Sequence, residues 1–77
     1  MNQDRRKRLE KIQGLIDDAI AQLEEIREEE QEAFDNMPES IQDGERGETM
    51  QEHISNMEDV ESSLDDARSV LEDVVNV

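Results

Sequence analysis

The chain has no cysteine, one aromatic residue and one proline among its 77 residues. Without cysteine it can form neither a disulfide framework nor a thiolate metal site. With Phe34 as the only aromatic residue, it lacks the rings that stack on nucleotide bases or form an aromatic cage. Long apolar runs are missing too, so we expect neither a secretory signal nor a membrane span, and we expect a cytoplasmic location.

Apolar residues recur in steps of three and four along two segments, a spacing typical of a helix with one buried face. In the first segment they are Leu9, Ile12, Ile16, Ala19, Leu23, Ile26, Ala33 and Met37. In the second segment they are Met50, Met57, Val60, Leu64, Ala67, Leu71 and Val74. The pattern predicts two α-helices, over about residues 3–36 and about 45–76, and it assigns these residues to the seam between them.

A loop with a short helical turn, over about residues 37–44, separates the two helices and contains the only proline, Pro38. A residue before proline is disfavoured in the helical region, so the first helix ends there. Pro38 also suits the first position of a short helical turn that continues through Gln42. We expect Ile41 to fold back under this turn, near Phe34.

The start of the second helix has two candidate caps. Asp43 could cap it directly, and Thr49 could form a capping box with Glu52 one turn later. Because a loop this short makes long helices antiparallel neighbours, the sequence predicts an all-α fold. Residues 1–77 form one domain, an antiparallel, coiled-coil-like two-helix hairpin.

Five further apolar residues flank the predicted seam, more than a two-helix contact requires. They are Leu15, Ile20, Ile54, Val70 and Val75. A chain of this length also buries only about 60% of its unfolded surface, which makes a lone core marginal. We therefore expect a homodimer, a four-helix bundle in which these five residues contribute to the interface.

Acidic residues dominate the charge: 23 Asp and Glu against 8 Lys and Arg give a formal net charge of -15. Residues 5–11 hold five of the eight basic side chains, so residues 12–77 carry 3 basic and 21 acidic ones. This balance disfavours direct binding to nucleic acid or to anionic membranes. We expect the basic segment to be neutralised by Glu72, Asp73 and the chain carboxylate at the end of the second helix.

Glu30 and His53 interrupt the apolar pattern at positions that face each other in the hairpin. We interpret them as a structural polar pair that fixes the helix register; a pH switch and a metal ligand are the alternatives. A Glu-x-x-His motif fails because Met50 lies three residues before His53. No calcium loop, serine nucleophile motif or phosphate-binding glycine loop is present, so we predict no enzyme and no catalytic, cofactor or metal residues.

The run Asp35-Asn36-Met37-Pro38-Glu39-Ser40-Ile41-Gln42, followed by Glu45-Arg46-Gly47-Glu48, carries a resemblance to a known group of proteins. It resembles the turn of small acidic helical-hairpin proteins of uncharacterised function from bacteria and their phages and prophages. The resemblance implies a phage-linked origin, with the host cytoplasm as the location, and implies no activity.

Two functions are consistent with these features. The first is a non-enzymatic protein-interaction module that self-associates or binds a protein partner. The second is a phage-encoded inhibitor that mimics nucleic acid and occupies the basic groove of a host nucleic-acid-binding or defence enzyme. Direct nucleic-acid binding through residues 5–11 is less favoured. The candidate partner-binding carboxylates are Glu24, Glu25, Glu28, Glu29, Glu32, Asp59, Asp65 and Asp66.

Overall fold

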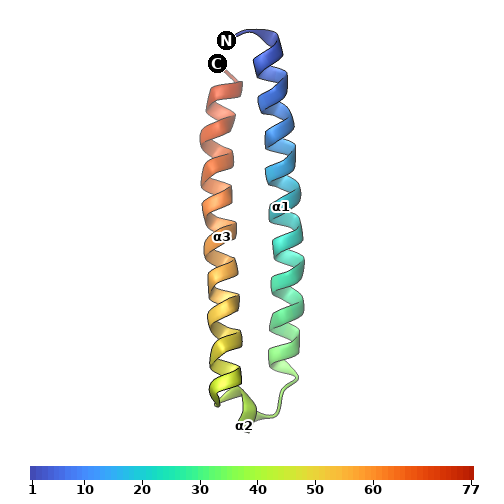
Figure 1. Cartoon of the computed structure of the whole chain (residues 1–77), viewed down its shortest axis with the longest axis vertical. Coiled ribbons are helices and arrows are strands. Elements are labelled where there is room, and N and C mark those ends of the chain that lie inside the picture. The colour runs from blue at the N-terminus through green and yellow to red at the C-terminus, as the bar shows by residue number, and fades with distance from the viewer.

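Two long antiparallel helices form nearly the whole molecule (Figure 1). In the computed structural model, which describes residues 1–77, α1 spans Gln3–Asp35, α2 spans Glu39–Gln42 and α3 spans Glu45–Val75. Both termini lie at one end of the rod and α2 at the other, with Cα extents of 58 × 15 × 12 Å. The predicted all-α hairpin and its short helical turn are confirmed. None of the helices combines the length and apolar character that crossing a membrane requires.

The two long helices begin in different ways. Asn2 caps α1, because its side-chain oxygen accepts a hydrogen bond from a backbone N–H of the first turn at 2.9 Å. α3 begins after Gly44 with no capping side chain. Both predicted caps, Asp43 and Thr49, are therefore wrong. Since the helix starts a turn before Thr49, that hydroxyl donates to the carbonyl oxygen of Glu45 instead, at 3.0 Å.

Gln42 and Gly47 close the loop end of the hairpin. Gln42 Nε2 donates to the carbonyl oxygen of Phe34 at 2.8 Å, an oxygen that also accepts from the backbone N–H of Met37 at 3.1 Å. Gly47 is buried because the Gln42 backbone packs against it; a Cβ at Gly47 would lie 2.6 Å from the Gln42 Cα. Ile41, predicted to fold back toward Phe34, is 39% exposed, and Gln42 is the residue that reaches back.

One seam of buried and half-buried side chains joins the long helices, again in steps of three and four. On α1 and just beyond it, these residues are Leu9, Gln13, Ile16, Ile20, Leu23, Arg27, Glu30, Phe34 and Met37. On α3 they are Gly47, Met50, Ile54, Met57, Glu61, Leu64, Arg68, Leu71 and Val75.

The seam predicted from the sequence is therefore half wrong. Ile12, Ile26, Val60 and Val74, assigned to it from the apolar pattern, are 44%, 50%, 47% and 40% exposed. Both helices are rotated about their axes relative to the prediction. Because the apolar stripe on each helix is three columns wide and a helix pair uses two columns, one apolar column remains outside the contact.

The core of the single hairpin is small. Apart from Gly47, only Ile54 and Val75 are buried, each with 6% of its surface exposed. The accessible surface is 5749 Å², against roughly 4,800 Å² expected for a compact monomer of 8.9 kDa, an excess of roughly 900 Å². The radius of gyration is 17.4 Å, against about 11.5 Å for a compact domain of this length. The hairpin thus exposes more surface than a compact domain of its size, and nine large hydrophobic side chains are among its exposed residues.

Candidate protein interface

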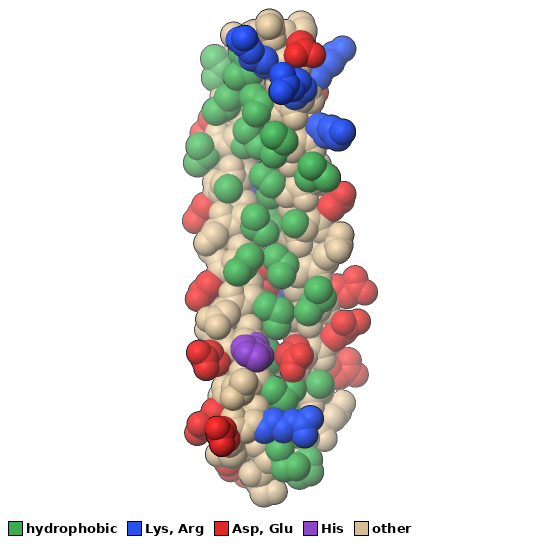
Figure 2. Space-filling view, viewed as in Figure 1, with side chains coloured by type: hydrophobic (Ala, Val, Ile, Leu, Met, Phe, Trp, Pro, Cys, Tyr) green, Lys and Arg blue, Asp and Glu red, His purple; other side chains and the backbone are tan.

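A stripe of apolar side chains runs along one side of the seam, and we call it the outer stripe. It consists of Ile12, Ala19, Ile26 and Ala33 on α1 and of His53, Val60, Ala67 and Val74 on α3. All are exposed except Ala19, which is half-buried. Each residue directly precedes a seam position, and in an antiparallel pair such positions of both helices fall on the same side. Figure 2 shows apolar side chains in green along the middle of this face, above and below the single histidine.

The residues of the outer stripe form layers that alternate in size. Cross-helix bonds from Arg68 to Asp17 and from Arg27 to Glu61 set the helix register. In this register the layers are Ile12 with Val74, Ala19 with Ala67, Ile26 with Val60, and Ala33 with His53. Consecutive layers are about 10 Å apart, one heptad of helix. Large aliphatic layers therefore alternate with layers that contain alanine.

Leu15 and Val70, two of the five predicted interface residues, lie next to the outer stripe near its terminal end. They are 58% and 65% exposed, so both are free to contact a partner. Val70 also lines an open hollow at this end together with Met1, Arg6, Asp73, Val74 and Val77.

The other three predicted interface residues lie inside the hairpin. Ile54 and Val75 are its two buried hydrophobic residues, and Ile20 is half-buried in the seam. This placement corrects the prediction that they flank the seam. The correction follows from the rotation of the helices, which brings the column of Ile20 into the contact and turns the column of Ile26 out.

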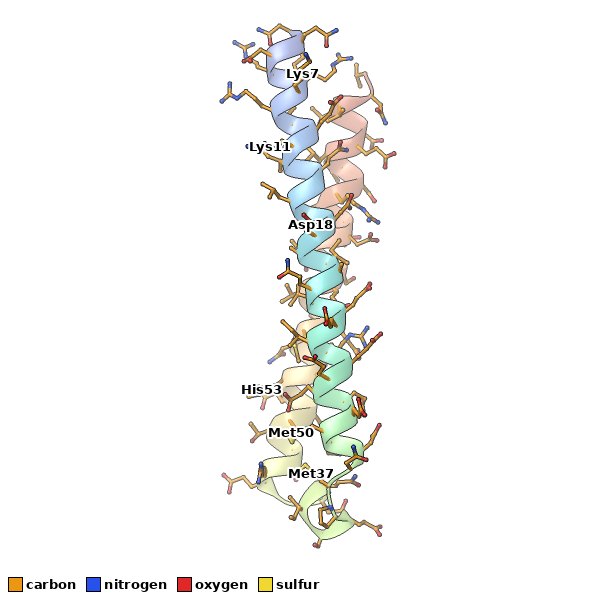
Figure 3. The ribbon with its side chains drawn as sticks, turned by 90° about the vertical axis from the view of Figure 1, so that its right-hand side faces the viewer. Lys7, Lys11, Asp18, Met37, Met50 and His53 are labelled. Atoms are coloured by element: carbon orange, nitrogen blue, oxygen red, sulfur yellow. The ribbon has the colours of Figure 1, made fainter.

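Glu30 and His53 do not form the predicted polar pair. Glu30 is half-buried in the seam, whereas His53 is exposed on the outer stripe and projects from the side of α3 (Figure 3). No hydrogen bond or ion pair joins them. The rotation of the helices is again the reason, because it turns His53 away from the seam.

Arg27 and Glu61 form the polar pair of the seam instead. Arg27 Nε donates to Glu61 Oε2 at 2.7 Å and Nη2 to Oε1 at 3.4 Å, with the side chains 28% and 12% exposed. The hydrogen bond to Glu61 raises the pKa of Arg27 above its ordinary value, against the lowering effect of desolvation. Sequence analysis did not identify this pair, because neither residue belongs to the apolar pattern from which the seam was predicted. One feature of the sequence could have indicated the pair: Arg27 lies seven residues after Ile20 and seven before Phe34, so it belongs to the same helix column as these two apolar residues.

All eight candidate partner-binding carboxylates are exposed. Glu24 and Asp65 directly follow seam positions, which places them on the side of the hairpin opposite the outer stripe. Arg68 bonds to both Asp17 and Asp65, and the Asp17 hydrogen bond raises the pKa of Arg68. No group of three or more His, Cys, Asp or Glu side chains is arranged to hold a metal ion.

The terminal end contains two contacts made by its arginines. Arg6 Nη2 donates across the helices to the backbone oxygen of Val77 at 2.7 Å. Arg8 pairs with Asp4 on the same helix at 3.6 Å, and both side chains are largely exposed, so this pair contributes little to stability.

The other basic side chains of residues 5–11 have no ion-pair partner. No carboxylate lies within 4.0 Å of Arg5, Lys7 or Lys11. Glu72 and Asp73 form no ion pair with any basic side chain. Glu72 and Asp73 therefore make no direct ion pair with the basic segment, whereas Arg6 contacts an oxygen of the last residue, Val77, at the end of the second helix. Figure 3 shows Lys7 and Lys11 on the terminal part of α1.

Comparison of the chain with protein-family models, with curated proteins and with solved structures finds no match.

Proposed function

We propose that the protein is a non-enzymatic interaction module that self-associates through the outer stripe into a four-helix bundle. The observation that carries this proposal is the exposure of large aliphatic side chains along one face of an otherwise acidic rod. Ile12, Ile26, Val60 and Val74 are all at least 40% exposed. Soluble monomers rarely leave a contiguous apolar patch of this kind uncovered.

The energetics of the hairpin support the same proposal. With only Ile54 and Val75 buried among its hydrophobic residues, a lone hairpin has little burial to offset the entropy of ordering 77 residues. Burying the outer stripe against a second helix pair adds layers to the core, as in other four-helix bundles. Folding and assembly of this chain are then linked, so that its stability depends on its concentration.

Sedimentation equilibrium across a range of chain concentrations tests the proposal. We expect a mass near twice 8.9 kDa for the native chain. Replacing Ile26 by Gln removes about 1 kcal/mol of burial per copy, because this side chain is already half covered in the hairpin. Because each dimer contains two substituted copies, the free energy of dimerisation is weakened by about 2 kcal/mol, and the dimer Kd rises about thirtyfold.

Ala21→Gln is the matched control for Ile26→Gln. Ala21 is exposed on α1 and belongs to neither the seam nor the outer stripe, so its substitution leaves the Kd unchanged. A native chain that sediments at 8.9 kDa at every concentration would contradict the proposal. Equal effects of the two substitutions would show that the outer stripe is not the interface.

A second candidate function is a nucleic-acid-mimicking inhibitor of a host defence enzyme or another basic nucleic-acid-binding enzyme. Its supporting observation is that the acidic columns, including Glu24 and Asp65, lie opposite the outer stripe and stay accessible in a dimer. The resemblance of the turn to phage-linked hairpins supports it as well. We expect association with such an enzyme to weaken steeply as ionic strength rises, and to compete with duplex DNA. Association that is unaffected by salt argues against mimicry.

A further inference from the structure

We infer that the second copy docks on the outer stripe turned end for end, so that α1 packs against α1 of the partner and α3 against α3. This inference rests on the proposed self-association and adds the orientation. A second copy could instead dock with both loops at the same end, which pairs α1 with α3 of the partner. Both arrangements keep neighbouring helices antiparallel. The size of the side chains and the distribution of charge decide between them.

Side-chain size favours the reversed orientation on α1. Reversal about the middle of the outer stripe places Ile12 opposite Ala33 of the partner and Ala19 opposite Ile26 of the partner. Each large side chain then meets a small one, the arrangement that lets facing layers interdigitate.

On α3 the same relation holds for one of the two pairs. Reversal places Val60 opposite Ala67 of the partner, a large side chain against a small one, and it places His53 opposite Val74 of the partner. With both loops at the same end, the layer of Ile26 and Val60 would instead lie opposite the same layer of the partner. The layer of Ala19 and Ala67 would likewise lie opposite the same layer of the partner. Aliphatic side chains would then collide at one layer and leave a gap at the next, and both faults are costly in a packed interface.

Charge along the rod favours the same orientation. The loop half, residues 24–60, carries 14 acidic and 2 basic residues, a balance of -12. The terminal half, residues 1–23 and 61–77, carries 9 acidic and 6 basic residues, a balance of -3. Docking with both loops at one end would set two strongly acidic halves side by side. Reversal sets each acidic half beside the less charged terminal half of the partner.

The unpaired cations at the terminal end fit this reversed arrangement. Arg5, Lys7 and Lys11 have no carboxylate partner within the hairpin. In the reversed dimer the terminal end of each copy, which carries these side chains, lies at the same level along the rod as the loop end of the partner, where Asp35 and Glu39 are exposed. Opposite charges at the two ends therefore align the copies and disfavour the alternative.

The available area is large enough for a stable dimer. The outer stripe extends over 22 residues of α1, from Ile12 to Ala33. A patch about 32 Å long and about 20 Å wide, the width of two helices, covers roughly 640 Å² per copy. The roughly 1,300 Å² buried in total lies within the range of standard specific interfaces.

Distance measurements between spin labels test the orientation. Because the chain has no cysteine, a single Ser40→Cys or Gln22→Cys substitution provides one labelling site per copy. Both residues are exposed, and neither side chain makes a hydrogen bond. Gln22 lies near the middle of the outer stripe, and Ser40 lies in α2 at its loop end.

In the reversed dimer, the two labels at Ser40 are separated by roughly 50 Å, the length of 35 helical residues, whereas the two labels at Gln22 are within about 15 Å. Labels at Ser40 within about 20 Å of each other, in a sample with a dimeric mass, would overturn the orientation and leave the self-association intact. A monomeric mass with no dipolar coupling at either site would overturn the self-association and the orientation together.

Discussion

Replacing Gly47 by alanine tests the packing of the loop end, with Gly14→Ala as its control. Gly14 lies in the interior of α1 and Gly47 in the first turn of α3, and neither has a positive φ. Propensity alone therefore predicts that alanine stabilises the chain at both positions, by about 0.5–1 kcal/mol. The structure predicts effects of opposite sign.

The difference lies in the space around each Cα. A Cβ at Gly14 meets no atom within 4 Å. The alanine variant should therefore gain all the stability that the higher helix propensity of alanine provides. A Cβ at Gly47 would lie 2.5 Å from the carbonyl carbon of Gln42 and 2.6 Å from its Cα. Ordinary carbon contacts are about 3.5–4.0 Å, so the backbones must separate by about 1 Å. These neighbours are backbone atoms, which cannot move aside as a side-chain end can.

The expected magnitude follows from three contributions. Overpacking of this kind costs about 1–3 kcal/mol. Displacing Gln42 also weakens its hydrogen bond to Phe34, which is worth about 1 kcal/mol. After subtracting the helix-propensity gain, we expect Gly47→Ala to destabilise the fold by about 1–3 kcal/mol.

Thermal unfolding followed by circular dichroism measures both variants. At about 4–8 °C per kcal/mol for a domain of this size, Gly47→Ala lowers Tm by about 5–20 °C, and Gly14→Ala raises it by about 2–8 °C. All samples are compared at one chain concentration, because self-association makes Tm concentration-dependent. A Gly47→Ala protein as stable as Gly14→Ala would refute the close backbone contact between α2 and α3.

Three further predictions concern stability. Arg27→Met leaves Glu61 without its partner in the seam and lowers Tm, whereas adding Glu61→Leu recovers part of the loss; a double-mutant cycle with no coupling would contradict the pairing. Gln42→Ala removes the hydrogen bond to Phe34 and destabilises the fold by about 1 kcal/mol in urea unfolding, and an unchanged midpoint would mean that water replaces this bond at no cost. The Tm of the native chain rises with its concentration, and a constant Tm over a hundredfold range would argue against linked folding and assembly.

The sequence alone was sufficient to predict the hairpin. Apolar steps of three and four are compatible with a helix and with no other regular element, and Pro38 cannot continue one, so the helices and the turn between them are local consequences of residue order. A short loop then leaves the long helices no arrangement other than antiparallel neighbours. The helix ends were predicted to within about one residue for the same reason.

Only the tertiary structure decided which side of each helix faces the other. The apolar stripe has three columns, and periodicity gives all three nearly equal weight. The column of Ile20 and Ile54 was turned inward and the column of Ile26 and Val60 outward. The inward columns also contain charged residues, and one of them, Arg27, lies across from its counter-charge Glu61. This pair joins residues 34 positions apart, so no local pattern contains it.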